Sequence, residues 1–113
     1  MTALDHDVVA EAFGTVITHD GDRTVVELRG EIDMNVSPAL ETVLRDLVAD
    51  DHVHLVLDLT ALEFIDSSGL AAFVAANRAA VAAGGDVHLR SPRPSTMRIL
   101  ETTRLTELLP LEA

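Results

Sequence analysis

The stretch HLVLDLTALEFIDSSGLAAFVAANR, from His54 to Arg78, decides the fold. Val53–Leu59 is almost continuously apolar, which is the pattern of a strand covered on both faces. Asp66 and two serines then stop the apolar run. An alanine-rich segment follows and predicts a helix from about Ser67 to Ala83, which ends at two glycines. A buried strand that leads into a long helix is typical of a largely parallel sheet in an α/β fold.

The flanking sequence predicts the other elements of such a domain. Two runs rich in β-branched residues, Phe13–Thr18 and Arg23–Arg29, are separated by HDGD and predict a hairpin. Residues 35–50 have apolar side chains at helical spacing, with Ser37 as the N-cap. A strand, a short helix and a last short strand are predicted at Asp86–Ser91, Ser95–Glu101 and Leu105–Leu109. We therefore predict one α/β domain over residues 11–113, after a lead-in of residues 1–10. Its mostly parallel sheet has four to five strands, an N-terminal β-hairpin and helices packed on it.

Composition limits the function classes. The chain has 113 residues, of which 48% are hydrophobic and 24% charged, so it can bury one core. It has no cysteine, which excludes disulfides and thiolate metal sites. We see no secretory signal and no apolar run of the ~18 residues that a membrane span needs, so we expect a cytoplasmic protein without membrane insertion.

The net charge of −11 is unevenly distributed, because residues 1–66 hold 3 arginines and 15 acidic residues. Such a surface disfavours nucleic acid and anionic membranes as partners, and it suits a partner with a basic face. The plain alternative is that the acidic residues only keep the protein soluble.

Acidic side chains follow the predicted strands at Asp33, Asp58 and Asp66. Functional groups in parallel sheets gather beyond the carboxyl ends of the strands. Ser67 and Ser68 lie beside the third acid, at the positive end of a helix, which stabilises an added phosphate by roughly 0.3–1 kcal/mol. A phosphate there adds about −1.5 to −2 charges and would repel a bound partner. The alternative is a simple helix cap.

The predicted second helix has an unusual alanine-rich face. Its larger residues form one stripe that we expect to face the sheet: Leu70, Phe73, Val74, Asn77 and Val81. The remaining face begins at Ser67 and includes Ala71 and Ala75, with Arg78 as its only charge. We predict that this small-residue face is a docking surface, and that Gly69 lets a partner's backbone approach closely. Alternatively, the alanines only favour the helix.

Other chemistries find little support. His52 and His54 are spaced like a metal-binding pair, but no third ligand stands at a recognisable spacing. Ser67 lacks the G-x-S-x-G context and a plausible base for nucleophilic catalysis. There is no G-x-x-x-x-G-K loop and no lysine, which disfavours nucleotide hydrolysis. We predict no enzyme activity, no cofactor and no metal.

Several segments together resemble the STAS domain of bacterial anti-sigma factor antagonists. They are RGEIDMNVSPALETVL, HLVLDLTALEFIDSSGLAAFVAANR, GGDVHLRSP and the short helix that follows. The likeness covers roughly Phe13–Leu109, and D-S-S-G-L with an upstream G-E-[IL]-D is its most specific part. Two features depart from the family: the chain ends at Ala113, where a last helix is common, and SPRPSTMRILETT has an extra proline and arginine.

The resemblance implies a phosphorylation switch. It implies that Ser67 is phosphorylated by an anti-sigma factor with serine-kinase activity. It also implies that only the unphosphorylated form binds this partner and so frees a sigma factor. A manganese-dependent serine phosphatase would then reset the switch. Asp33 matches the family's acid near the serine, which takes part in the kinase contact. With the docking face, the predicted partner-binding set is Asp33, Asp66, Ser67, Ser68, Gly69, Leu70, Ala71, Ala75 and Arg78. The alternative is a STAS subunit of a lipid transport complex, in which the same face contacts an ATPase constitutively.

Overall fold

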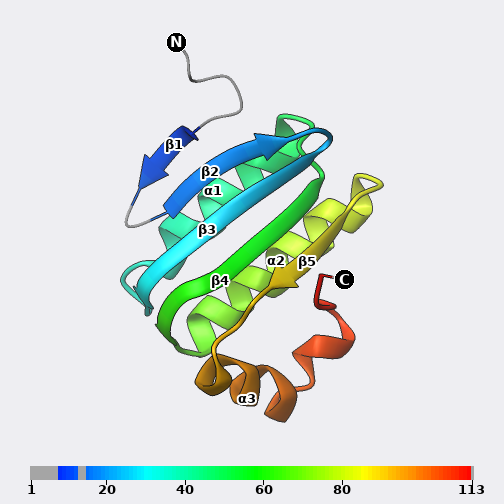
Figure 1. Cartoon of the computed structure of the whole chain (residues 1–113). Coiled ribbons are helices and arrows are strands. Elements are labelled where there is room, and N and C mark those ends of the chain that lie inside the picture. Colours follow the sequence, from blue (N-terminus) through cyan, green and yellow to red (C-terminus); the bar gives the residue numbers. More distant parts are fainter. Residues whose placement is uncertain (1–7, 13–14, 113) are drawn as a thin grey trace.

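The computed structural model describes residues 8–12 and 15–112 (Figure 1). Three strands come first, and helices then alternate with two further strands. The strands are β1 (Val8–Ala12), β2 (Thr15–Asp20), β3 (Arg23–Ile32), β4 (His54–Ile65) and β5 (Asp86–Arg90). The helices are α1 (Ser37–Ala49), α2 (Ser67–Ala82), α3 (Pro94–Thr102) and the 3-10 helix η1 (Leu105–Glu107).

The strands form one sheet in the order β1-β2-β3-β4-β5. The β1/β2 and β2/β3 pairs are antiparallel, whereas the helix-connected pairs β3/β4 and β4/β5 are parallel, as predicted. The hairpin between β2 and β3 is confirmed where it is described, with Asp20 opposite Arg23 and Gly21 at a φ of 66° in the turn. Phe13, the predicted start of that hairpin, lies outside the described residues.

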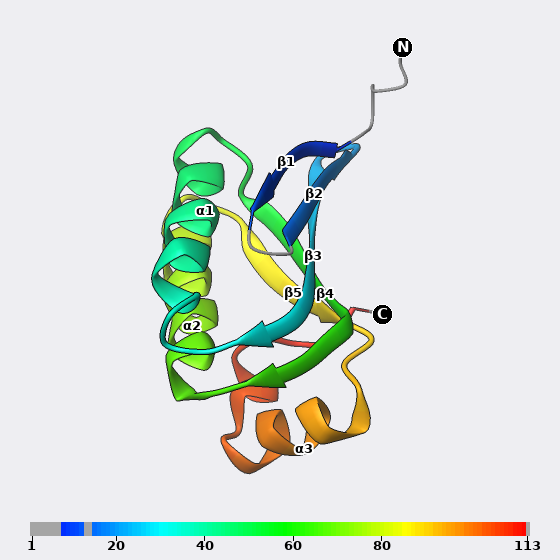
Figure 2. The same ribbon diagram turned by 90° about the vertical axis from the view of Figure 1, so that its left-hand side faces the viewer.

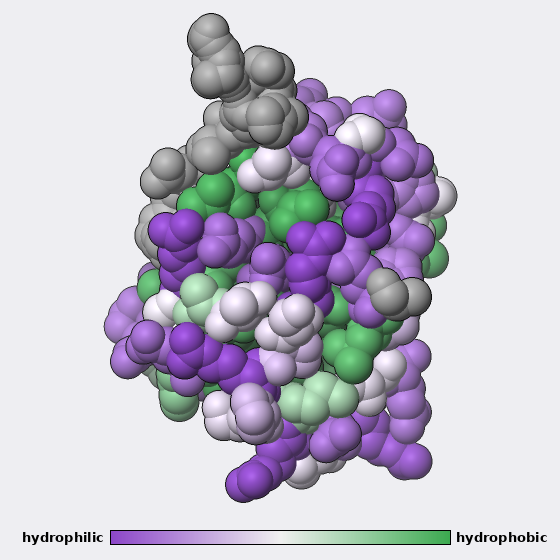
Figure 3. All heavy atoms as spheres, viewed as in Figure 1, coloured by the Kyte–Doolittle hydropathy of each residue, from purple (hydrophilic) through white to green (hydrophobic). Residues whose placement is uncertain are grey.

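Helices α1 and α2 lie side by side on one face of the sheet, and α3 lies beyond the bent ends of β3 and β4 (Figure 2). The core fills the space between this face and the two helices. Its fully buried large side chains are Leu28, Ile32, Leu40, Leu44, Leu55, Leu57, Leu59, Leu62, Phe73, Leu89, Leu100 and Leu109. Figure 3 shows the opposite face of the sheet, where hydrophilic residues surround smaller hydrophobic areas.

The start of α1 differs from the prediction. Ser37 is the first residue of the helix rather than its N-cap, and it is buried. The N-cap position is Val36, whose side chain cannot accept a hydrogen bond. The preceding turn is closed instead by Asp33, whose backbone carbonyl accepts hydrogen bonds from the N–H groups of Val36 and Ser37 at 3.0 and 2.8 Å. The capping oxygens thus come from Asp33.

Both ends of the chain also differ from expectation. Val8–Ala12, largely within the predicted lead-in, pairs with β2 as strand β1. Residues 1–7 lie outside the described residues. The predicted strand Leu105–Leu109 is wrong, because that segment forms η1. Its leucines are four residues apart, which suits a helical turn, and Leu109 is fully buried. After this turn, Leu111 forms an isolated parallel β-bridge with Leu89 of β5.

Candidate functional site

Asp66 caps the helix that carries the two serines. Its carboxylate Oδ1 accepts hydrogen bonds from the backbone N–H groups of Ser68 at 2.9 Å and Gly69 at 3.2 Å. It also accepts one from the Ser68 hydroxyl. The Ser68 hydroxyl contributes most to lowering the pKa of Asp66, with the backbone amides of Gly69, Ser68 and Met34 acting in the same direction. Asp66 is therefore a fixed negative charge at the start of α2.

The two serines have different environments. Ser68 is half-buried, and its hydroxyl is held by Asp66. Ser67 is exposed, and within the described part of the chain its hydroxyl makes no hydrogen bond to another residue. In the sequence analysis, only the family resemblance separated Ser67 from Ser68. The structure leaves Ser67 as the serine whose oxygen is available to an enzyme from outside.

Asp33 lies at the neighbouring helix start. The ends of β3 and β4 are paired at Ile32 and Ile65, and the Asp66 N–H donates to the Ile32 carbonyl at 3.2 Å. Asp33, the next residue, accepts hydrogen bonds at its carboxylate from the N–H groups of Asn35 at 2.9 Å and Val36 at 3.3 Å. The structure thus brings Asp33 and Asp66 to the same edge of the sheet, as the motif spacing predicted.

Gly69 and Leu70 point into the protein. Both are buried, so neither presents a side chain to a partner. A Cβ atom at Gly69 would lie 2.6 Å from Cγ1 of Ile65 and 2.8 Å from Cγ2 of Ile32. The missing side chain therefore lets α2 approach its own sheet. The expectation that Gly69 makes room for a partner's backbone is replaced by this internal contact.

The outward face of α2 is narrower than predicted. Ser67, Ala71 and Arg78 are exposed, and Ala75 is half-buried. The predicted sheet-facing stripe is wrong at Val81, which is exposed. The outer face was also expected to include Ala72 and Ala76, but both of these alanines are buried. Helix α1 packs beside α2, so small side chains are needed where the two helices come close.

Two exposed apolar residues at this edge were missed by the sequence analysis. The side chain of Met34 is 71% exposed, and that of Phe64 is 49% exposed. Met34 follows Asp33, and Phe64 lies three residues before Ser67. In the sequence Phe64 belongs to the apolar run ALEFI, which has no feature that separates an outward residue from its buried neighbours.

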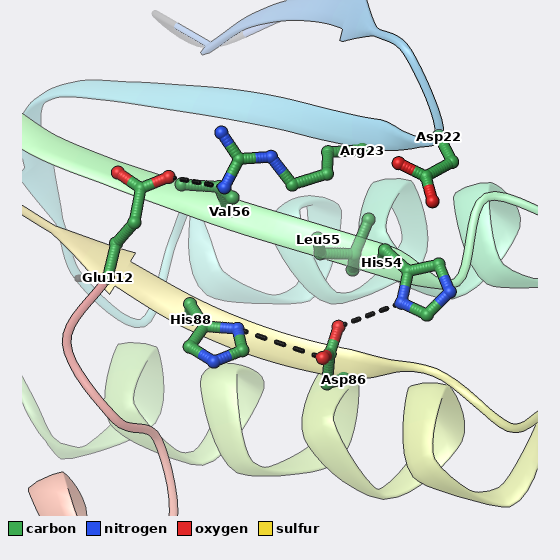
Figure 4. Close-up of a pocket in the computed structure, with 8 residues that line it drawn as sticks. All are labelled: Asp22, Arg23, His54, Leu55, Val56, Asp86, His88 and Glu112. Atoms are coloured by element: carbon green, nitrogen blue, oxygen red, sulfur yellow. Dashed lines mark hydrogen bonds and ion pairs between the residues drawn. The ribbon is translucent and has the colours of Figure 1, made fainter.

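A second polar region lies on the opposite face of the sheet (Figure 4). It lines a hollow of about 340 Å³ with side chains from β3, β4, β5 and the C-terminal segment. The Glu112 carboxylate pairs with Arg23 of β3 at 2.7 Å and with Arg90 of β5. The Asp86 carboxylate accepts a hydrogen bond from His54 Nδ1 at 3.0 Å. The region is an ion-pair network across three strands.

The histidines of the chain do not form a metal site in the described residues. His52 stacks on His19, with ring centroids 4.2 Å apart, whereas His54 pairs with Asp86. Within residues 8–12 and 15–112, no group of three or more His, Asp or Glu side chains could hold a metal ion. The predicted His52 and His54 pair is therefore divided between two different local contacts.

Comparison with known proteins identifies the family. The STAS domain family model matches residues 15–113, which include both strand-end aspartates and the two serines. The chain belongs to the STAS domain family. Over 56 residues it is 45% identical to the anti-sigma-F factor antagonist RsfB of Mycobacterium tuberculosis, a match that covers 50% of this chain and 45% of that protein. The alignment thus spans just under half the length of this curated relative.

Solved STAS structures agree with the fold. An anti-sigma factor antagonist from Mycobacterium paratuberculosis has 35% sequence identity and a TM-score of 0.77, over 86% of this chain and 82% of that one. The Bacillus cell fate determinant SpoIIAA, in its phosphorylated form, has 18% identity and a TM-score of 0.70, over 88% of this chain and 91% of that one. The second likeness concerns the fold alone. No helix in the described STAS domain is long and apolar enough to cross a membrane.

Proposed function

We propose that this STAS domain is an anti-sigma factor antagonist whose binding is switched by phosphorylation of Ser67. In the unphosphorylated state it binds an anti-sigma factor with serine-kinase activity, and a sigma factor is released. The observation that carries the proposal is the exposed hydroxyl of Ser67, which makes no bond within the described domain, beside a Ser68 hydroxyl that is already held by Asp66.

The transfer step needs little from this domain. The Ser67 Oγ attacks the γ-phosphorus of ATP bound to the kinase, the bond to the bridging oxygen of the β-phosphate breaks, and ADP leaves. The hydroxyl proton passes to a base of the kinase. The domain supplies an acceptor oxygen at the start of a rigid helix, so that the kinase positions one well-ordered group. A manganese-dependent serine phosphatase would restore the hydroxyl.

The local charges explain why a phosphate would end binding. The N–H groups of Ser68 and Gly69 are already bonded to Asp66, so the first turn of α2 has fewer donors left to draw a phosphate inward. About −1.5 to −2 charges would then be added beside the carboxylates of Asp66 and Asp33. A partner surface that fits the neutral serine would meet a bulky, strongly charged group. Phosphorylation therefore changes the contact surface without requiring a change of fold.

The names of similar proteins support this proposal. RsfB and the Mycobacterium paratuberculosis protein are anti-sigma factor antagonists, and SpoIIAA has been solved in a phosphorylated form. The net charge of −11 adds a reason to expect a partner with a basic face. Asp33, Ala71, Ala75 and Arg78 remain proposed contacts around Ser67.

The test uses the purified serine-kinase anti-sigma factor of the source organism with ATP. Ser67→Ala is expected to abolish phosphate incorporation, whereas the matched control Ser68→Ala keeps it. Ser67→Glu is expected to weaken binding at least tenfold, or about 1.4 kcal/mol. Equal labelling of Ser67→Ala and wild type would refute the site. Binding that is unchanged by Ser67→Glu would refute the switch and favour a constitutive contact, as in a transport complex.

A further inference from the structure

Strand β4 contains extra residues beside the candidate site. Between the pairs Glu27–Asp58 and Arg29–Ala61, β3 advances by two residues and β4 by three. Between the pairs Gly30–Leu62 and Glu31–Phe64, β3 advances by one residue and β4 by two. These are two β-bulges, and Gly30 at the second has a φ of 72°. Bulges re-aim side chains and are frequent next to functional sites.

The second bulge determines which way Phe64 points. Leu62 and Ile65 are both buried, although residues three apart in a regular strand lie on opposite faces. The extra residue in β4 resolves this conflict. It keeps both of these side chains in the core and leaves Glu63 and Phe64 together on the outside. Phe64 then lies beside its cross-strand partner Glu31, which is also exposed.

The fold gains little from this placement of Phe64. The other phenylalanine in the described residues, Phe73, is fully buried in the core. Half of a phenylalanine side chain amounts to roughly 100 Å² of exposed aromatic surface. Met34 adds a second exposed apolar side chain. It follows the end of β3, which pairs with the end of β4 at Ile32 and Ile65, directly before the Asp66 cap of α2. The backbone around the site thus presents an apolar pair to solvent.

This apolar pair lies within reach of any enzyme that modifies Ser67. Phe64 is three residues from Ser67, so their Cα atoms are at most about 11 Å apart. Met34 lies two residues after Ile32, whose carbonyl accepts the hydrogen bond from the Asp66 N–H at 3.2 Å. A kinase must bring its phosphate donor into contact with the Ser67 oxygen, so its surface has to cover the neighbouring side chains. The occupant of this patch is therefore the kinase itself.

We propose that Phe64 and Met34 are the apolar anchors by which the serine-kinase anti-sigma factor holds this domain, and that Glu31 and Glu63 select basic side chains around its binding pocket. Aromatic residues supply a large share of the energy at the centre of protein interfaces. Charged residues at the rim mainly affect association rate and partner choice. The patch formed by Met34, Phe64, Glu31 and Glu63 therefore fits an apolar pocket with a basic rim. The inference rests on the proposed function and names the residues that would contact the kinase.

The test measures the affinity of the unmodified domain for the purified kinase. Phe64→Ala is expected to weaken binding at least tenfold, and Met34→Ala to weaken it severalfold. The matched control is Leu108→Ala, because Leu108 is a 45% exposed apolar residue near the C-terminus. The affinity of this variant for the kinase is expected to stay within twofold of wild type. Glu31→Arg is expected to slow association and to reduce its dependence on salt.

The outcomes separate this inference from the proposed function. If wild type binds and is phosphorylated on Ser67, but Phe64→Ala and Met34→Ala bind as wild type does, the anchor assignment is wrong and the switch stands. If wild type neither binds nor is phosphorylated, the proposed function itself fails. Thermal unfolding of each variant shows whether the fold is kept. Should Phe64→Ala unfold, Met34→Ala decides the result, because its side chain is mostly outside the fold.

Discussion

Glu112 provides a direct test of how the C-terminal segment is held. Its carboxylate accepts hydrogen bonds from Arg23 Nη1 of β3 at 2.7 Å (Figure 4) and from Arg90 Nη2 of β5 at 2.8 Å, and so joins β5 to β3 across the exposed face of the sheet. The hydrogen bond from Arg90 is the main cause that lowers the pKa of Glu112 to about 2, and Arg23 adds to it. We predict that Glu112→Gln destabilises the protein in a pH-dependent way.

The magnitude follows from the two pKa values. A carboxyl group with a pKa of 4.5 in the unfolded chain and about 2 in the folded protein contributes at most about 3 kcal/mol at neutral pH. The Glu112 side chain is only 18% exposed, but that of Arg23 is 43% exposed, so water and salt weaken the pair. We therefore expect a loss of about 1 to 2 kcal/mol. Because folding lowers this pKa, the contribution is complete above pH 4.5 and disappears as the pH falls toward 2.

The assay is urea unfolding of wild type and Glu112→Gln at neutral pH and at several acidic pH values. The difference in free energy of unfolding is expected to shrink steadily below pH 4.5. Glu107→Gln is the control, since its pair with Arg104 is exposed at both ends and is expected to contribute almost nothing. A difference that is the same at every pH, or an equal loss in the control, would refute the argument.

Two further predictions concern packing and titration. Gly69→Ala is expected to lower the free energy of unfolding by roughly 1 to 3 kcal/mol, because the new methyl group would lie 2.6 Å from Cγ1 of Ile65. An unchanged melting temperature would show that α2 can move away from the sheet. The pKa of His54 is raised above 6.5, mainly by its hydrogen bond with Asp86, and that of His19 is lowered, mainly by burial. An NMR titration is therefore expected to show His54 gaining its proton at higher pH than His19, and an equal or reversed order would contradict these two environments.

Local patterns in the sequence were sufficient for most of the fold. The hairpin, the buried central strand and the aspartate-capped helix α2 depend on short-range signals, namely a glycine turn, a continuous apolar run and an acid before a helix. β1 was missed because Val8–Ala12 is short and becomes a strand only through pairing with β2. The segment Leu105–Leu109 was predicted to be a strand, but a helical turn through Leu105–Glu107 is what brings Leu109 into the core.

The candidate site was predictable at its centre and less so at its edges. The D-S-S-G-L motif was enough to place Asp66 and Ser67, since a cap and its helix are adjacent in the chain. The buried side of α2 could not be predicted, because alanines carry little directional signal. The contact with α1 decides which of these alanines are covered. Phe64 was missed for a different reason: its direction depends on a bulge, which is defined only relative to β3.

The segment that Glu112 secures also lies along the outer edge of β5. The Leu89 N–H donates to the Pro110 carbonyl at 2.9 Å, and the Glu112 N–H donates to the Leu89 carbonyl at 2.7 Å. Unpaired backbone groups at a sheet edge can template the addition of strands from other molecules, which is a route to aggregation. Here the chain itself occupies both backbone groups of Leu89 at that edge. At this position the edge of β5 is therefore closed to the addition of a strand from another molecule.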